Sequence, residues 1–540
     1  MSRKLRESAQ RLLDAERGTV YKDRGGKLSV CLVYPNTYSI GMSSLGYQGI
    51  YGLLNARPDV VCERAFLPPP EEMDEYRRTG EELCSLESQS PLGSFEVVAF
   101  SVSFENDYPA IPRMLEMARI PARASERTSS HPLVIAGGVC PSANPEPIAP
   151  IFDICFTGEA EEMLGEFVEA YKASGSREEL LKRALQIPGL YVPAFYDVSY
   201  NPDGTIAGRV ARDGAPERIT RRIVSDLSAH PMRSVIITPN AEFGDMCLIE
   251  PMRGCPWQCR FCLAGHLYRP PRRKGGEALM AEVQYARGMA GRVGMVGPSL
   301  SDHPDMPDVL TQEGVEFSLT SLRASPKSAG LAKLLRGARS VSIAPETGSD
   351  RLREFVNKKV TRAEIIESAR LILGIDGIER LRLYFMVGLP SETDEEALEI
   401  AALVREIREA APRGKLILTL SVFVPKAGTP FERMPMARPD VVKRRLGSIK
   451  KALVRVHGVS VFHDVPKYAF MQGLFSVGDR RVAEVILTMG DNIDWGATGT
   501  SSSKIDWRTA AKRVGVDPEF FIHREKPLTE RLPWEFIAGA

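Results

Sequence analysis

Short apolar runs separated by amphipathic stretches fill residues 28–175. The runs are SVCLVYP, VCERAF, EVVAFSVSF, LVIAGG and FDICFTG. Continuous apolar runs of this length are typical of strands in a parallel sheet that is buried on both faces. The pattern predicts an α/β domain of the flavodoxin-like Rossmann type, which would hold a ligand beyond the carboxyl ends of its strands.

The pattern changes on both sides of this region. Residues 1–27 have the charged pattern of an N-terminal helical extension. Within residues 176–244, the segment YDVSYNPDGTIAGRV places two strand-like runs around Asp203-Gly204, which is a β-hairpin signal. We therefore expect a linker that contains a small antiparallel element.

Strands and helices alternate again over residues 245–437. The strand candidates are MCLIEPM, VGMVG, EFSLTS, SVSIAP, RLYFMVG and LILTLSVFV. Thr361–Glu364 and Thr393–Glu396 have the spacing of capping boxes at helix starts. Because six β/α units fall short of the eight of a closed barrel, we expect a partial (β/α)6 TIM barrel. Residues 438–540 have a mixed pattern and are predicted to form a C-terminal cap domain, with a basic helix at 439–456.

Composition narrows the class of protein without naming a reaction. A chain of 540 residues is too long to fold around one hydrophobic core. Its net charge of +1 creates no strong electrostatic field that would attract it to nucleic acid or to a membrane. No apolar run approaches the ~20 residues that cross a bilayer, and the N-terminus lacks the apolar centre of a signal peptide. Cys31, Cys62 and Cys155 lie in strand-like runs as small hydrophobes. These features favour a soluble protein of the reducing cytoplasm.

The stretch MRGCPWQCRFCLAGH holds the candidate chemistry. Cys255, Cys259 and Cys262 are three of only nine cysteines in the chain. With His266 they could form a Cys₃His zinc site, and with Cys247 they could close an electron-carrying iron–sulfur cluster. Without a fourth ligand they would hold a 4Fe–4S cluster with one open iron. The position beyond a barrel-type strand argues against structural zinc, because α/β barrels place active sites there. The strand position of Cys247, among apolar neighbours, argues against the closed cluster.

This stretch resembles the radical S-adenosylmethionine (SAM) enzymes. Their mark is Cys-x₃-Cys-x₂-Cys after the first barrel strand, with an aromatic residue before the last cysteine, here Phe261. The resemblance implies that SAM binds the open iron of a 4Fe–4S cluster. One electron from the reduced cluster then breaks the C5′–S bond and gives a deoxyadenosyl radical. It also implies an external electron donor of the flavodoxin or ferredoxin type.

The resemblance continues at the ends of later strands. VGMVGPSLSDHP stands where many family members carry Gly-Gly-Glu, so this sequence departs from the family there. SLTSLRAS offers Arg323 for the methionine carboxylate, and SIAPETGSDRLR offers Glu346 for the ribose hydroxyls. LYFMVGLPSETDEE and SVFVPKAGTPFE resemble the fifth and sixth turns. Each motif alone also fits a helix cap or a turn. The candidate SAM contacts are Phe261, Ser299, Asp302, Ser321, Arg323 and Glu346.

The front domain resembles the cobalamin-binding domain of cobalamin-dependent radical SAM enzymes. The resemblance rests on segments such as VYPNTYSIGMSSLGYQGIYGLL and LVIAGGVCPSANPEPIAPIFDICFTGEAEEML. The loop at residues 36–45 contains no histidine, which excludes a histidine ligand to cobalt at that site. The candidate cobalamin lining is Ser101, Ser103, Gly137 and Gly138. The alternative is an empty slot in which the glycines only form a tight turn.

The sequence therefore predicts a radical SAM enzyme whose substrate it does not identify. If cobalamin binds, the expected reaction is methyl transfer to an unactivated carbon; otherwise it is a radical modification of RNA or a metabolite. Methylthiotransfer usually needs a second three-cysteine cluster, and the front-domain cysteines are too dispersed for one. RPPRRK (residues 269–274) and the basic helix are candidate contacts to RNA phosphates, although a solvated helix face also explains the second. Outside this class, an iron–sulfur electron carrier and a zinc-stapled RNA-binding module remain as alternatives.

Overall fold

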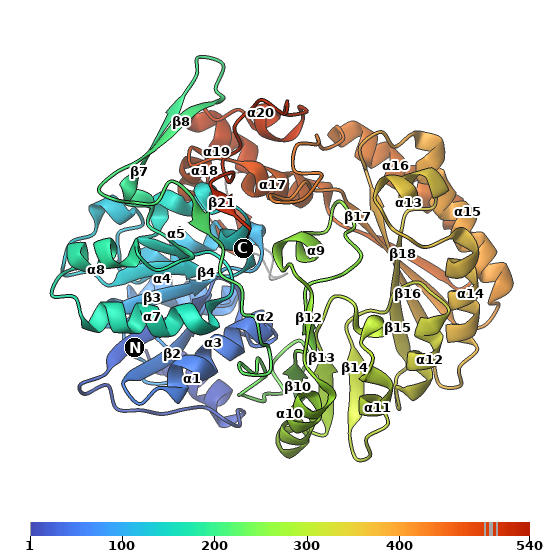
Figure 1. The fold of residues 1–540 in the computed structure, drawn as a ribbon, viewed down its shortest axis with the longest axis horizontal. Coiled ribbons are helices and arrows are strands. Elements are labelled where there is room, and N and C mark those ends of the chain that lie inside the picture. Colours follow the sequence, from blue (N-terminus) through green and yellow to red (C-terminus); the bar gives the residue numbers. More distant parts are fainter. Residues whose placement is uncertain (1, 491–492, 496–500, 504–505, 540) are drawn as a thin grey trace.

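The computed structural model describes residues 2–490, 493–495, 501–503 and 506–539. Of the predicted segments, 1–27 and 438–540 include residues outside these ranges. The chain forms an α/β structure in which two groups of parallel strands lie beside each other (Figure 1). The N-terminal group is drawn in blue and teal at the left, and the second group in green to orange at the right. The red C-terminal helices lie above the N-terminal group and reach toward the second.

All five apolar runs of the front region form strands of one sheet. Its order is β2-β1-β3-β4-β5-β6, with the first five strands parallel and β6 antiparallel to β5. All seven residues of β1 are buried, which explains its uninterrupted apolar run. The strands are β1 (Leu28–Tyr34), β2 (Val60–Phe66), β3 (Val97–Ser101), β4 (Leu133–Gly137), β5 (Ile154–Phe156) and β6 (Leu190–Tyr191). The helices are α1 (Arg3–Asp14), α2 (Tyr38–Met42), α3 (Leu45–Ala56), α4 (Pro70–Thr79), α5 (Ala110–Met117), α6 (Val139–Ala143), α7 (Ala160–Lys172) and α8 (Arg177–Ala184).

The segment after α8 contains the predicted hairpin. β7 (Tyr196–Tyr200) and β8 (Ile206–Ala211) pair antiparallel, which confirms that expectation. The short strand β9 (Ile219–Thr220) pairs in parallel with β21 (Ile537–Ala538). The segment is therefore fastened to the C-terminal end of the chain, a contact that the hydrophobic pattern did not indicate.

All six strand candidates of the second region also form strands, but they divide between two sheets. One sheet has the order β10-β13-β14 and the other β15-β16-β17-β18, and a single bridge, Leu322 to Ile343, joins the described residues of the two. β18 is an additional parallel strand beyond the predicted boundary at 437; the residues of β18 are only half-buried or exposed, so its pattern gave no signal. The strands are β10 (Met246–Ile249), β13 (Arg292–Met295), β14 (Glu316–Leu319), β15 (Ser340–Glu346), β16 (Arg380–Val387), β17 (Lys415–Val422) and β18 (Val459–His463).

Helices follow these strands along the chain. Both predicted capping boxes are present, with Thr361 and Glu364 at the start of α14 and Thr393 and Glu396 at the start of α15. The predicted basic helix is α16. The helices are α9 (Leu263–Leu267), α10 (Gly276–Met289), α11 (Met306–Leu310), α12 (Lys327–Leu334), α13 (Asp350–Phe355), α14 (Arg362–Leu373), α15 (Asp394–Ala410) and α16 (Pro439–Leu453).

The C-terminal helices bind the two regions together. Asn144 of the front region donates to the carbonyls of Ser476 and Gly478, at 3.1 and 2.9 Å. Lys426, after β17, pairs with Glu105 of the front region at 2.5 Å. Within the described residues, no helix combines the length and apolar character that crossing a membrane requires. The C-terminal helices are α17 (Pro466–Val477), α18 (Val482–Gly490), α19 (Trp507–Arg513) and α20 (Pro518–Ile522).

Candidate active site

The three-cysteine loop begins at a turn that only glycine can make. It follows β11 (Met252–Arg253), which lies just beyond the carboxyl end of β10. Gly254 has φ +79°, and a Cβ there would lie 2.0 Å from the carbonyl oxygen of Tyr268. Any side chain would collide with that fixed backbone, so Gly254 allows the chain to reverse and present Cys255. Within the loop, the Cys262 N–H donates to the Cys259 carbonyl at 3.0 Å.

The loop leaves room beside its cysteines. A Cβ placed on Gly265 would lie 3.9 Å from Cys262 Sγ and 4.0 Å from Cys255 Cβ, so this glycine keeps open the space that both cysteines border. Tetrahedral zinc at about 2.3 Å from each sulfur would require sulfurs about 3.8 Å apart. No His, Cys, Asp and Glu side chains of the described part gather in a group of three or more fit for one metal ion. His266, the fourth zinc candidate, turns Nε2 to the Cys259 carbonyl at 3.1 Å. In this arrangement His266 is engaged by the backbone of the loop instead of standing beside the three sulfurs as a fourth ligand.

Burial makes two of the loop cysteines, Cys259 and Cys262, weaker acids than an exposed cysteine. It raises the pKa of Cys259 to about 11, against the opposing effect of the nearby Lys358 ammonium. Burial also raises the pKa of Cys262. Because iron binds the thiolate, assembly of a cluster here must displace protons, which couples cluster uptake to pH.

The segment after α13 holds the loop in place. Asn357 donates through Nδ2 to the carbonyls of Trp257 and Gln258, at 3.3 and 2.9 Å. The Arg260 N–H donates to the Val356 carbonyl at 3.0 Å. Gln258 and Asn357 both have a positive backbone φ, of 52° and 56°, a conformation that residues other than glycine rarely adopt. Strained backbone of this kind often accompanies a functional site.

Phe261 anchors the same loop from its other side. Its ring packs against a small apolar cluster, separate from the main core, whose buried members are Leu352, Val356, Leu389, Phe423 and Phe431. The sequence predicted a SAM contact for Phe261. The contacts seen here are those of a residue that fixes the loop to the strand-end segments around it.

Trp257 connects the loop to two predicted SAM contacts. Its Nε1 donates to Asp302 Oδ2 at 2.6 Å, and the same oxygen accepts from Ser299 at 2.5 Å. The Arg323 guanidinium stacks on the Trp257 ring, 3.4 Å from its centroid. Asp302 and Arg323 follow β13 and β14, so the carboxyl ends of neighbouring strands converge on one tryptophan. Sequence reasoning did not assign Trp257, although it lies between the first two cysteines.

Glu346 is also brought to the loop, with a partner that the sequence did not indicate. Its Oε1 lies 2.9 Å from Lys358 Nζ, and both side chains are largely buried. Burial lowers the pKa of Lys358, but the charges of Glu346 and Cys259 outweigh that effect and raise it above its ordinary value. Glu346 itself has φ +69°, a third strained position at this site. The remaining candidate, Ser321, lines a separate groove between β14 and β15.

A cavity of about 510 Å³ lies between the front sheet and the strands of the second region. Its front wall comes from the carboxyl ends of β1, β3, β4 and β5, and its far wall from segments after β10, β13 and β14. The predicted Ser101, Ser103, Gly137 and Gly138 all line it. None of the described residues lining it is a histidine. Gly138 has φ +114°, and a Cβ there would lie 2.5 Å from the Val102 carbonyl, so a tight turn alone requires it. Gly137 carries no such restriction.

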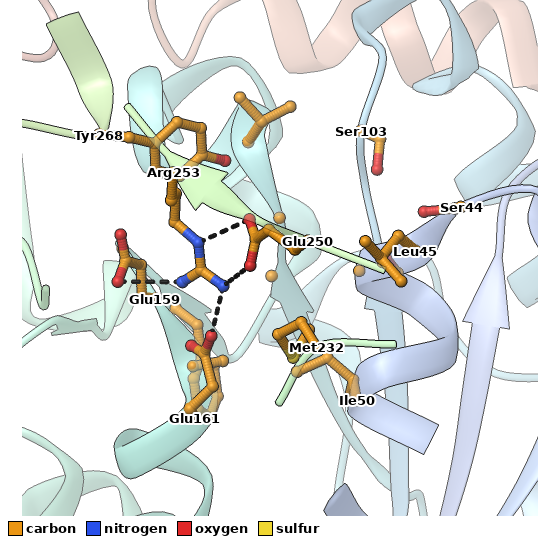
Figure 2. A pocket seen from close by; sticks show the side chains of 18 of the residues that line it. Ser44, Leu45, Ile50, Ser103, Glu159, Glu161, Met232, Glu250, Arg253 and Tyr268 are labelled. Carbon is orange, nitrogen blue, oxygen red and sulfur yellow. Dashed lines mark hydrogen bonds and ion pairs between the residues drawn. The ribbon is translucent and has the colours of Figure 1, made fainter. Parts of the chain in front are cut away.

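Arg253 joins the two walls of this cavity (Figure 2). It binds Glu250, after β10, through Nε at 2.9 Å and Nη2 at 2.6 Å. From the front region, Glu159 and Glu161 at the start of α7 approach to 3.0 and 2.7 Å. Burial alone would lower the pKa of Arg253, but its three carboxylates raise it well above the ordinary value. Arg253 lies two residues before Cys255, so the front region directly holds the start of the cysteine loop.

Some of the predicted RNA contacts form ion pairs within the chain. In RPPRRK, Arg272 pairs with Glu159 at 2.6 Å and Lys274 with Glu282 at 2.5 Å. On α16, Arg444 and Arg445 both pair with Asp394, at 2.8 and 2.9 Å. Internal ion pairs therefore account for part of the charge that suggested phosphate binding.

Two family models match this chain, one in the front region and one in the second region. Residues 46–193 match the family "Radical SAM proteins, N-terminal", and residues 249–404 match the "Radical SAM superfamily". The chain is 26% identical over 466 residues to the uncharacterized protein MJ0966 of Methanocaldococcus jannaschii, covering 85% of this chain and 90% of that one. It is 25% identical over 309 residues to tRNA-2-methylthio-N(6)-dimethylallyladenosine synthase of Sorangium cellulosum, covering 48% and 60%.

Among solved structures, the cobalamin-dependent SAM radical enzyme OxsB with aqua-cobalamin and SAM bound is similar with a TM-score of 0.44 and 15% identity. The match covers 70% of this chain and about half, 52%, of OxsB.

The chain is a radical SAM enzyme, in which the region that matches the N-terminal family precedes the region that matches the superfamily. Membership implies a 4Fe–4S cluster and SAM as cofactors, and an external reductant. The superfamily match begins at residue 249, so it contains the three-cysteine loop and the strand ends that converge on it.

Proposed function

We propose that Cys255, Cys259 and Cys262 hold the 4Fe–4S cluster and that the neighbouring strand ends bind SAM for reductive cleavage. The observation that carries this proposal is Trp257, which joins the cysteine loop to Asp302 by a hydrogen bond and to Arg323 by stacking. When bound, the cluster supplies the electron that cleaves SAM. The remaining work is positioning, and it falls to residues of this chain.

Each polar partner offers a different complement to SAM. Asp302 offers a carboxylate for the amino group and Arg323 a guanidinium for the carboxylate of the methionine part. Glu346 would accept from the ribose hydroxyls, with Lys358 balancing its charge at 2.9 Å. The pairing of Asp302 with Trp257 and Ser299 keeps its carboxylate oriented before SAM binds, which reduces the ordering cost of binding.

The architecture that we infer is a flavodoxin-like domain ahead of a partial barrel. The order β2-β1-β3-β4-β5 is that of flavodoxin-like sheets, whose ligands bind beyond the carboxyl strand ends. The parallel strands β10, β13 and β14, together with β15 to β18, support an open barrel whose mouth faces the same cavity. We place a domain boundary near residue 175, and the pairing of β17 with β18 favours moving the boundary at 437 beyond β18.

We further propose the cavity as a corrinoid site. Its front wall combines apolar strand ends with Ser101, Ser103 and the unrestricted Gly137, where backbone can approach a bulky ring. The absence of histidine among its described lining residues means that cobalt would take no imidazole from that wall. Methyl transfer to an unactivated carbon is the reaction that such a cofactor would supply. The electron donor would be of the flavodoxin or ferredoxin type.

Methylthiotransfer, the activity named for the Sorangium relative, is less well supported. A second cluster would need three cysteines grouped on a loop of the front region and not packed into its hydrophobic core. Cys31, Cys62, Cys140 and Cys155 are buried there, and only Cys84 is partly exposed among the described front-region cysteines.

The proposal is tested on anaerobically reconstituted protein with SAM and dithionite. We expect release of 5′-deoxyadenosine, and we expect hydroxocobalamin to remain bound after desalting. An iron-containing protein that releases no 5′-deoxyadenosine would be an electron carrier, and zinc in place of iron would remove the proposal altogether. Retained SAM cleavage without corrinoid binding would keep the radical reaction and exclude cobalamin-dependent methyl transfer.

A further inference from the structure

Arg221 differs from the other buried arginines of the chain. Among the described residues, each of the others has a carboxylate partner. Those pairs are Arg64 with Glu16 and Glu87, Arg127 with Asp153, Arg253 with Glu159, Glu161 and Glu250, Arg353 with Asp350, and Arg445 with Glu392. Arg221 is only 9% exposed, and its side chain makes one hydrogen bond to the described residues, from Nε to the Ser142 carbonyl at 3.2 Å. A buried guanidinium without a counter-ion is costly, so its presence calls for an explanation.

The main chain fixes Arg221 between three parts of the molecule. Its N–H donates to the Ala538 carbonyl at 3.0 Å, in the pairing of β9 with β21. The next residue, Arg222, donates its N–H to the Thr157 carbonyl at 3.1 Å. Gly158, which lines the cavity, permits the close approach, since a Cβ there would lie 3.0 Å from Arg221 Cγ. The main chain and Cγ of Arg221 are therefore fixed by these contacts, and no carboxylate pairs with its guanidinium.

The surroundings of the guanidinium belong to the mouth of the second region. A Cβ on Gly428, in the loop after β17, would lie 4.0 Å from Arg221 Nη2. Tyr268, which follows the cysteine loop and lines the cavity, is the ionisable group that acts on Arg221. Burial raises the pKa of Tyr268 to about 12, so its hydroxyl keeps its proton at neutral pH and can act as a hydrogen-bond donor. Burial lowers the pKa of Arg221, in the direction expected for a charge without compensation.

We propose that Arg221 and Tyr268 form an anion-recognition site, and that the substrate carries a carboxylate or phosphate group which completes the pairing. This substrate class rests on the proposed function, because it places the substrate between the barrel mouth and the front region. A guanidinium offers a fork of parallel N–H donors that matches the oxygens of both groups. The Tyr268 hydroxyl adds a third donor from the cysteine-loop side.

Inorganic phosphate is the probe, tested on the cluster-reconstituted full chain without SAM or reductant. Because a ligand stabilises the folded state that binds it, we expect millimolar phosphate to raise the thermal midpoint above that in chloride of equal ionic strength. Arg221→Met should abolish this rise, and its own midpoint should equal or exceed that of the wild type, because it removes an unpaired buried charge. Arg221→Lys should respond weakly, since an ammonium lacks the fork.

Two further variants keep the test decisive. Arg222→Met alters the neighbouring arginine, which pairs with Glu162 and Glu166 at 2.9 and 2.6 Å, and should leave the phosphate response intact. Tyr268→Phe removes only the hydroxyl and should reduce the response even if Arg221→Met does not fold. A phosphate response that persists in both Arg221→Met and Tyr268→Phe would overturn the proposal, as would its absence from the wild type.

Cobalamin also carries a phosphodiester, so the source of the anion is tested separately. If the site serves the substrate, phosphate should still raise the midpoint of protein saturated with hydroxocobalamin. Competition between the two would assign the site to the corrinoid and overturn its assignment to the substrate. Neither result depends on SAM cleavage, which is measured independently as 5′-deoxyadenosine, so failure here and failure of the proposed radical reaction are distinguishable.

Discussion

The cysteine loop and the interdomain cavity are neighbours, because Gly254 and Ala264 on either side of the cysteines line the cavity. They are nevertheless built differently. The loop is held by contacts within the second region, from Asn357, Asp302 and Arg323. The cavity has walls from two regions and depends on ion pairs that cross between them. The comparison teaches that most contacts of the cysteine loop come from the second region, with Arg253 as its link to the front region, whereas the cavity exists only when both regions are packed together.

Arg253 is the point where the two meet. Three carboxylates from both regions surround it, whereas Arg221, at the same interface, has none. A buried charge is stable only when it is paired. Arg253 therefore stabilises the interface, whereas Arg221 has the unpaired guanidinium for which we propose an anionic ligand.

The largest effect should separate the loop from the cavity. Cys255→Ala, Cys259→Ala or Cys262→Ala should reduce 5′-deoxyadenosine formation to background. This loss exceeds the roughly 10–100-fold that changing an outer partner of a metal ligand costs. Iron content should fall with it, whereas hydroxocobalamin retention should remain, since the cavity walls are untouched.

Cys247→Ala is the matched control for these variants. Cys247 is buried within β10, so its loss should leave both iron content and turnover intact. If Cys247→Ala also loses the cluster, a fourth thiolate closes it, and SAM would have no iron to bind.

The second-largest effect is expected from removing the arginine that joins the two walls of the cavity. Arg253→Met leaves Glu159, Glu161 and Glu250 without their shared partner and should lower the free energy of unfolding by about 3–5 kcal/mol. Despite its burial, Glu159 has a pKa lowered by Arg272 and Arg253, so its stabilisation is present above the ordinary glutamate pKa and is lost as the pH falls below it. The gap between wild type and variant should therefore narrow on acidification.

Denaturant unfolding of the cluster-free chain at neutral and acidic pH measures this. Arg222→Met, which breaks more exposed pairs, should cost about 1 kcal/mol or less. An Arg253→Met protein as stable as the wild type at neutral pH would show that the carboxylates do not depend on Arg253.

The smallest effect is expected from removing the hydrogen bond between the cysteine loop and Asp302. Trp257→Phe removes the donor to Asp302 but keeps a ring beneath Arg323, so the affinity for SAM should fall about tenfold, in line with the ~1.5 kcal/mol of a hydrogen bond to a charged group. Equilibrium dialysis with SAM measures this affinity. Trp534→Phe makes the same chemical change at a tryptophan that donates to Glu432 at 2.7 Å and should not alter it. Equal affinities in all three proteins would remove Asp302 from the SAM site.

Much of the fold was predictable because the relevant signals are local. Eleven strand candidates, five in the front region and six in the second, all form strands. A strand buried on both faces, such as β1, needs an uninterrupted apolar run, and a strand that buries every second residue, such as β15, needs an alternating one. The capping boxes at Thr361 and Thr393 were readable because all of their bonds lie within four residues. β18 was missed because its residues are not fully buried, and the pairing of β9 with β21 because a two-residue strand has no periodicity.

By itself, the sequence determined the three-cysteine loop and the order in which the strand ends follow one another along the chain, because residue spacing sets both. Only the tertiary structure decided which polar residues meet. The pairs are Trp257 with Asp302, Glu346 with Lys358, and Arg253 with the front-region carboxylates, whose members lie from 12 to 94 positions apart in the sequence. The same is true of the unpaired Arg221, because a missing partner is visible only once every neighbour is in place. Charged side chains pair across distances in space and not along the chain, so their partners are fixed only when the chain has folded.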